Sequence, residues 1–166
     1  MLARKETKMN IFSAGDVVRF AIRLEENGES FYRKAAAITD DKGVADLFNS
    51  LADEEIKHRK VFEDLFSRAE WIEPAESYPG EYFAYLRNYM DGRIIFSADS
   101  QSEVPGIHTT AAALEFAIQR ELDSILYYQE LRTFVPPKDS GTLDTIIAEE
   151  RKHFARLSEQ KRRLTH

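Results

Sequence analysis

The sequence contains no cysteine. This absence excludes disulfide bridges, iron–sulfur clusters, thiolate zinc sites and iron centres held by four cysteines within the chain. A cysteine-free chain is compatible with a reducing compartment. The sequence also lacks an apolar run long enough to span a bilayer, and its first ten residues lack the apolar segment of a signal peptide. We therefore expect a cytoplasmic protein with no membrane partner.

The chain also has no excess of positively charged residues. The chain has 23 lysines and arginines against 29 aspartates and glutamates, which gives a formal net charge of −6. This balance argues against nucleic acid as the main partner. It is the sign expected of a protein that uses several carboxylates to bind cations.

Glycine and proline are scarce, with seven and five in 166 residues. Four long stretches almost free of them predict helices over residues 13–38, 40–69, 109–135 and 140–164. Short connections within the first pair and within the second pair predict two antiparallel hairpins. We therefore predict an all-α four-helix bundle forming a single domain over residues 1–166, with residues 1–12 flexible.

A longer segment, residues 71–108, connects the two hairpins. It contains a predicted short helix at residues 81–90, and aromatic side chains are frequent between residues 78 and 96. In one interpretation this crossover lays its aromatic side chains on the bundle. In the other, the aromatic stripe forms a contact or a domain swap between two copies of the chain. We expect a homodimer.

The two halves of the sequence repeat. Residues 21–25, which end in Glu25 and precede Phe31 and Tyr32, correspond to residues 117–121, which end in Glu121 and precede Tyr127 and Tyr128. The segment Glu-Glu-Ile-Lys-His at 54–58 corresponds to Glu-Glu-Arg-Lys-His at 149–153. The repeat predicts two hairpins related by a pseudo-twofold axis.

Heptad-like spacing predicts which face of each helix lies in the core. Each predicted inward face is apolar except near its middle, where a glutamate or a Glu-x-x-His pair interrupts it. For the third long helix the predicted inward residues are Ala111, Leu114, Ile118, Glu121, Ile125 and Tyr128.

These interruptions predict a metal site. Burying an uncompensated carboxylate costs several kcal/mol, whereas two divalent cations balance four carboxylates and leave imidazole as a neutral ligand. One glutamate from each of two helices and Glu-x-x-His from each of the other two is the ligand set of di-iron and di-manganese bundles. The candidate ligands are Glu25, Glu55, His58, Glu121, Glu150 and His153.

Some neighbouring residues call for separate interpretation. Glu54 and Glu149 fall outside the predicted inward faces, and we expect them to be solvated. Tyr32 and Tyr128 lie two turns after Glu25 and Glu121. They are either core aromatic residues or hydrogen-bond donors to the metal carboxylates, and we favour the second role as a tentative catalytic one.

At these positions the sequence resembles the rubrerythrin-like proteins of the ferritin-like superfamily. The stretches AIRLEENGESFYRKAA and LADEEIKHRKVFEDL carry most of the likeness. The resemblance implies a ferritin-like fold with a long crossover and a non-haem di-iron centre, in which manganese or zinc could replace iron in the isolated protein. It also implies that Glu55 and Glu150 bridge the two ions, with Glu25 and His58 completing one and Glu121 and His153 the other.

The resemblance implies an oxidoreductase that reduces peroxide or dioxygen. The alternatives are an iron-binding protein of ferroxidase or sensing type and a purely structural metal bundle. Two departures from rubrerythrins stand out. The chain has no cysteine for a rubredoxin domain, so we expect an external electron donor such as a rubredoxin-like protein or another reductase. Ser124 occupies the position where rubrerythrins carry a second carboxylate, one turn after the ligand Glu121.

Overall fold

The computed structural model describes residues 14–68, 80–90 and 107–164. Over these residues it contains α1 (Ala14–Ile38), α2 (Lys42–Arg68), α3 (Glu81–Met90), α4 (Thr110–Leu131), a 3₁₀ turn (Arg132–Phe134) and α5 (Pro137–Leu164). The segment expected to be flexible, residues 1–12, lies outside this part of the chain. So do the portions of the predicted crossover on either side of α3.

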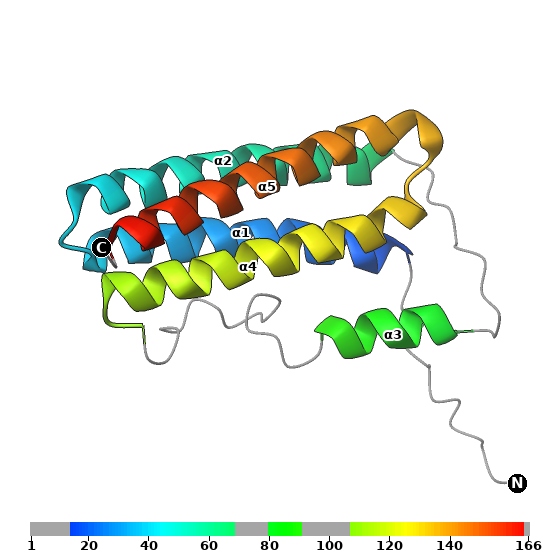
Figure 1. Ribbon diagram of the computed structural model, residues 1–166. Coiled ribbons are helices and arrows are strands. Elements are labelled where there is room, and N and C mark those ends of the chain that lie inside the picture. The colour runs from blue at the N-terminus through cyan, green and yellow to red at the C-terminus, as the bar shows by residue number, and fades with distance from the viewer. Residues whose placement is uncertain (1–13, 69–79, 91–106, 165–166) are drawn as a thin grey trace, which may run out of the picture.

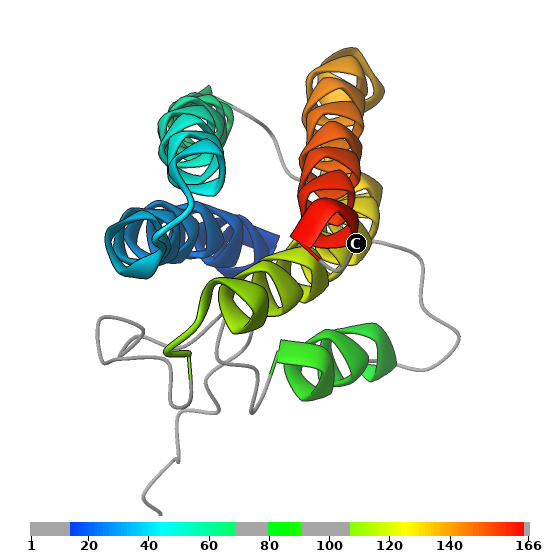
Figure 2. The same cartoon turned by 60° about the vertical axis from the view of Figure 1, so that its left-hand side comes forward.

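The four long helices form a bundle of two antiparallel hairpins, as predicted (Figure 1). Helix α1 packs against α2, and α4 packs against α5, while α1–α4 and α2–α5 contacts join the hairpins. Viewed closer to the bundle axis in Figure 2, the hairpins are separate pairs and α3 lies outside, beside α4. Helices α2 and α4 run in the same direction (Figure 1).

Local signals set the helix ends. The Asp41 carboxylate accepts a hydrogen bond from the Val44 amide at 2.9 Å, and the Thr109 hydroxyl accepts one from the Ala112 amide at 3.2 Å. Helix α5 begins at Pro137, earlier than the predicted start near residue 140. Proline fits the first turn of a helix because its missing N–H has no partner there in any case.

The core consists of two apolar clusters along the bundle. One gathers Val18, Phe62, Leu65 and Leu143 with their neighbours. The other gathers Phe48, Leu51, Leu114 and Leu157 with theirs. The clusters occupy different turns of the same helices, and the buried polar residues fall between them in the sequence of α2 and α5. The polar centre is therefore flanked by apolar packing on both sides.

The predicted inward faces are confirmed for α2 and α5, where every predicted position is buried. In α2 these positions are Val44, Phe48, Leu51, Glu55, His58, Phe62 and Leu65, and in α5 they are Leu143, Ile146, Glu150, His153 and Leu157. For α4 the prediction is partly wrong. Ala111 is exposed, Ile118 and Ile125 are only half-buried, and Arg120 and Tyr127 are buried instead. The buried face of α4 is rotated because α3 covers one of its sides and because Arg120 points into the bundle.

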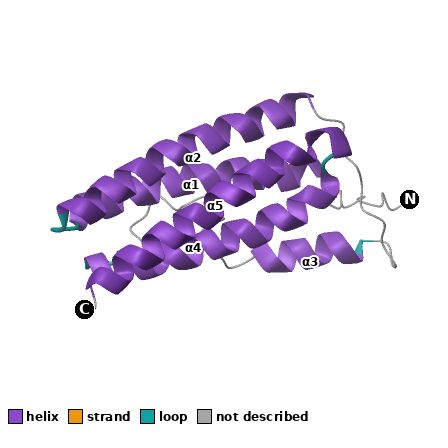
Figure 3. Ribbon diagram, turned by 45° about the horizontal axis from the view of Figure 1, so that its top comes forward, coloured by secondary structure: helices purple, strands orange, loops and turns teal. Residues whose placement is uncertain are grey.

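Helix α3 lies along α4, as Figure 3 also shows. Leu86 is fully buried in the first apolar cluster. The Tyr89 hydroxyl donates to the Asp123 carbonyl at 3.1 Å, and the Tyr82 hydroxyl donates to Glu130. This part of the connection does lay aromatic side chains on the bundle. A contact between copies of the chain stays a prediction. None of the described helices is long and apolar enough to cross a membrane.

Candidate metal centre

All six predicted ligands meet at the middle of the bundle. Each is at most 3% exposed. They form two overlapping sets, Glu25, Glu55, His58 and Glu150, and Glu55, Glu121, Glu150 and His153, within each of which the candidate ligand atoms lie no more than 4.8 Å apart. Glu55 and Glu150 belong to both sets, which is the arrangement expected of carboxylates shared between two cations.

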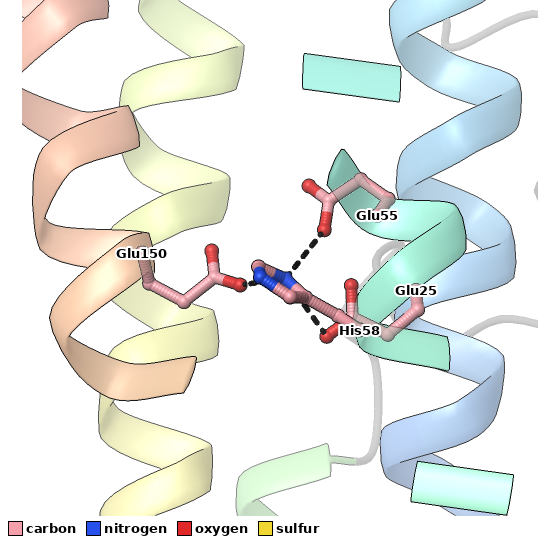
Figure 4. A group of neighbouring side chains, drawn as sticks. All are labelled: Glu25, Glu55, His58 and Glu150. Atoms are coloured by element: carbon pink, nitrogen blue, oxygen red, sulfur yellow. Dashed lines mark ion pairs between the residues drawn. The ribbon is translucent and has the colours of Figure 1, made fainter. Parts of the chain in front are cut away.

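Figure 4 shows the first set around the imidazole of His58, with the carboxylates from α1, α2 and α5 directed towards it. The Nδ1 atom of His58 lies 2.8 Å from Glu150 Oε1, 3.5 Å from Glu55 Oε2 and 4.0 Å from Glu25 Oε1. In the second set, His153 Nδ1 lies 3.4 Å from Glu150 Oε2 and 3.6 Å from Glu121 Oε2. Both imidazoles thus present the same nitrogen to the carboxylates.

Apart from the ion pairs between the imidazoles and the carboxylates, the atoms facing this centre form no hydrogen bonds among the described residues. They are one oxygen each of Glu25, Glu55 and Glu121, both oxygens of Glu150, and Nδ1 of both histidines. Buried polar atoms are nearly always hydrogen-bonded, and leaving one without a partner costs about 1–3 kcal/mol. Seven such atoms converging on one point have the composition and placement of a donor set for metal cations. The residues present therefore fit a pair of metal ions.

The outer nitrogen of each histidine is held by a glutamate from the opposite hairpin. His58 Nε2 on α2 lies 2.8 Å from Glu149 Oε2 on α5, and His153 Nε2 on α5 lies 2.9 Å from Glu54 Oε2 on α2. The expectation that Glu54 and Glu149 are solvated is therefore wrong as to their role. A carboxylate on the outer nitrogen fixes the tautomer that leaves Nδ1 as the ligand atom.

The two tyrosines also connect the hairpins. The Tyr32 hydroxyl on α1 donates to Glu121 Oε1 on α4, and the Tyr128 hydroxyl on α4 donates to Glu25 Oε1 on α1. The hydrogen bonds that we favoured from the sequence are present. Each tyrosine occupies one oxygen of its glutamate and leaves the other, Oε2, facing the centre. A catalytic role for the tyrosines stays a prediction.

Arg120 is a buried residue of the centre that the sequence analysis missed. Its Nη1 donates to Glu55 Oε1 at 2.9 Å and to Glu121 Oε1 at 3.2 Å. One signal for it existed in the sequence. Gly28 interrupts the inward face of α1 at the level of the glutamates, and this is where the guanidinium of Arg120 lies.

Burial and the neighbouring charges both shift the pKa values of the residues at the centre. Burial, then the charge of Glu55, raises the pKa of Glu25, and burial, then Glu150, raises the pKa of Glu121 to about 8. Burial disfavours the charged forms of the histidines, but the surrounding carboxylates outweigh it. They raise the pKa of His58 to about 12 and that of His153 to about 11.

For the two shared glutamates, the neighbours outweigh burial. The charge of Arg120 lowers the pKa of Glu55, and the close approach of Glu121 and of the two histidines lowers that of Glu150. The metal-free centre therefore keeps its shared carboxylates ionised by holding protons on its imidazoles. Cations would take the place of those protons.

Carboxylate oxygen and imidazole nitrogen suit iron, manganese and zinc, and the absence of sulfur ligands disfavours copper(I). A bundle of two antiparallel hairpins with four glutamates and two histidines at its centre defines the ferritin-like di-iron carboxylate class. Comparison with known proteins agrees with this assignment. The rubrerythrin family model matches residues 16–91.

One similar solved structure is the crystal structure of a protein from Thermotoga maritima assigned to the ferritin-like diiron-carboxylate proteins. It is 29% identical to this chain, with a TM-score of 0.64, and the alignment covers 90% of this chain and 94% of that one. No curated protein matches the chain. The predicted resemblance is confirmed: the chain resembles rubrerythrins over residues 16–91, and its all-α fold is similar to that of a ferritin-like diiron-carboxylate protein.

Ser124 departs from the rubrerythrin pattern in the structure as it does in the sequence. Its side chain is buried, and its hydroxyl donates to the Arg120 carbonyl at 3.0 Å. It belongs to neither set of candidate ligands. Ser124 therefore adds no charge to the centre.

Proposed function

We propose that the chain binds two metal ions, iron in the cell, and acts as a non-haem di-iron oxidoreductase that reduces peroxide or dioxygen. The observation that carries this proposal is the set of seven buried oxygen and nitrogen atoms that meet where four helices come together and have only one another as close polar neighbours. A structural polar network would satisfy these atoms internally. Two iron ions cycling between the ferrous and ferric states supply the electrons for such a reduction.

The protein's own residues hold this centre in place. Glu55 and Glu150 belong to both sets of candidate ligands. Glu25 and His58 complete one set, and Glu121 and His153 complete the other. Glu54 and Glu149 orient the imidazoles, and Tyr32 and Tyr128 orient the terminal glutamates. The flanking apolar clusters exclude bulk water from the centre. Because the chain has no cysteine, its electrons would come from an external donor such as a rubredoxin-like protein.

Metal stoichiometry is the first test. We expect two iron ions per chain after anaerobic loading of the metal-free protein, measured by elemental analysis. The variants His58→Asn and His153→Asn should each bind one. A single ion bound by the unaltered chain would contradict the two-metal site.

Rapid mixing with peroxide or dioxygen tests the reaction. Because Ser124 provides no additional carboxylate, we expect the reduced protein to react with dioxygen at an appreciable rate instead of being strongly selective for peroxide. A peroxide reaction faster by about a hundredfold, or ~2.7 kcal/mol in barrier, would show that Ser124 does not set selectivity. Oxidation followed by release of ferric iron, without turnover of peroxide, would favour the iron-handling alternative.

The variant Ser124→Glu provides the converse check on selectivity. It restores the carboxylate that rubrerythrins carry at this position, so the preference should move towards peroxide. No change in this variant, with metal content intact, would show that position 124 does not act on the metals.

A further inference from the structure

Arg120 places a fixed positive charge against the candidate metal centre. Its side chain is 2% exposed, and among its contacts are Glu55 Oε1, Glu121 Oε1 and, through Nη2 at 3.0 Å, the Leu24 carbonyl. The guanidinium also lies over the ring of Tyr32, 5.3 Å from its centroid. Arginine stays charged at any ordinary pH, so the guanidinium brings a permanent positive charge to this position.

Gly28 makes the space for this guanidinium. A Cβ atom at position 28 would overlap Nη2 and Cζ of Arg120 and would lie 3.0 Å from Nη1. Glycine is unfavourable inside a helix because of its backbone freedom. Gly28 nevertheless lies in the middle of α1, where any side chain would displace the arginine.

The internal repeat shows that this feature belongs to one half of the centre only. In the repeat that aligns Glu25 with Glu121, the counterpart of Arg120 is Leu24 and the counterpart of Gly28 is Ser124. Leucine brings no charge to the set that contains Glu25 and His58. Of the two terminal glutamates, only Glu121 receives a hydrogen bond from an arginine among the described residues.

We propose that Arg120, admitted by Gly28, is a positioning residue that makes the two metal positions unequal, so that the position built on Glu121 and His153 binds its divalent cation more weakly and fills second. The proposal rests on the proposed two-metal site. Its physical basis is twofold. The guanidinium repels a cation bound beside it, and it occupies lone pairs of Glu55 and Glu121 that a cation would otherwise share.

Titration of the metal-free chain with Co²⁺, followed by visible absorption and calorimetry, tests this inequality. We expect two binding steps whose dissociation constants differ by at least about tenfold, or ~1.4 kcal/mol. The variant His153→Asn should lose the weak step and keep the tight one, and His58→Asn should do the reverse. Two steps that differ only by the statistical factor for equal sites would overturn the proposal. Fewer than two Co²⁺ per unaltered chain would instead overturn the proposed function.

Two independent variants remove the guanidinium. Arg120→Leu copies the residue in the other half, and Gly28→Ala leaves the arginine in the chain but excludes it from its place. In both variants the dissociation constant of the weaker Co²⁺ binding step should fall towards that of the stronger step. The variant Arg120→Lys keeps the charge and should preserve part of the difference between the two dissociation constants. Gly141→Ala is the matched control, because a Cβ at this helical glycine meets no atom within 4 Å.

Circular dichroism of each metal-free variant shows which ones are folded. If Arg120→Leu does not fold, Gly28→Ala and Arg120→Lys still carry the test. If the ratio of the two Co²⁺ dissociation constants is unchanged in those of the three variants that fold, the arginine only fills space.

Discussion

At the scale of single residues, the glutamates one position before each Glu-x-x-His ligand pair determine which histidine nitrogen faces the centre. Glu149 holds His58 Nε2 although its own side chain is 43% exposed. Glu54 holds His153 and is itself held by Arg156 Nη1 at 2.8 Å. Both carboxylates therefore act on the metal ligands from outside the core.

The variant Glu149→Ala should lower metal affinity by about 10- to 100-fold, because His58 loses the partner that orients it. Competition with a chromophoric chelator measures this loss. The variant Glu149→Gln keeps an acceptor oxygen, so its metal affinity should lie between those of the unaltered chain and of Glu149→Ala. Glu63→Ala removes an exposed glutamate of α2 and serves as the control. Equal effects of Glu149→Ala and Glu63→Ala would contradict the assignment.

The histidines also predict how the metal-free protein responds to pH. Their folded-state pKa values of about 12 and about 11 exceed the unfolded value of about 6.5, so their stabilising effect is complete below about pH 6.5 and is lost as pH rises. Glu121, with a pKa of about 8, acts in the same direction between about pH 4.5 and pH 8. The free energy of unfolding without metal should therefore fall from about pH 5 to about pH 9.

Urea denaturation of chelator-treated protein at several pH values measures this trend. Metal binding should show the opposite dependence, with affinity rising with pH, because cations replace protons on the imidazoles. Calorimetry in buffers of different ionisation enthalpy should detect the released protons. A metal-free protein that becomes more stable over this pH range would refute the prediction.

The sequence predicted the candidate ligands and the two tyrosines that support them, but it missed the other supporting residues, for a physical reason. Periodicity within single helices is a local property of the sequence, and it predicts Glu25, Glu121 and the two Glu-x-x-His pairs. Glu54 and Glu149 find their histidines on the opposite hairpin, and Arg120 reaches Glu55 on another helix. Such contacts depend on the register between hairpins, which no local pattern encodes.

At the scale of helices, α3 is part of the core as well as of the connection. Leu86 is fully buried and Met90 is 5% exposed, and both belong to the apolar cluster that α1, α2, α4 and α5 share. The variant Leu86→Ala should therefore lower the free energy of unfolding by about 2–5 kcal/mol through the cavity it leaves. Chemical denaturation measures this change.

Asn88→Ala is the control within the same helix, because Asn88 is exposed. It should change stability by no more than about 0.5 kcal/mol. A Leu86→Ala variant as stable as this control would mean that α3 undocks without consequence for the bundle. The existence of α3 was predictable from its local pattern. Its position beside α4 was only one of two interpretations, since an aromatic stripe suits a second copy of the chain equally well.

At the scale of the whole molecule, the metal-free centre concentrates charge in the core. Removing metal by chelation should lower the melting temperature clearly, because bound ions stabilise only the folded chain. Replacing Glu25 and Glu121 together by leucine should recover part of this loss in metal-free protein and abolish activity. Differential scanning calorimetry compares the proteins. Melting curves unaffected by chelation and by the double replacement would show that these carboxylates do not contribute to the stability of the core.

The hydrogen bonds that the tyrosines and histidines of the centre make share one further property: they cross from one hairpin to the other. Tyr32 reaches Glu121, Tyr128 reaches Glu25, and the two histidines reach Glu149 and Glu54. We therefore expect a bound ion to leave only after some of these hydrogen bonds open and the hairpins begin to separate.

Metal residence time should therefore be set by the bundle's own opening. At high chelator concentration the release rate should reach a plateau that no longer depends on the chelator. The same opening rate should then govern amide exchange in the middle turns of α2 and α5. If both rates agree, the lifetime of the bound metal would measure how often the two hairpins separate.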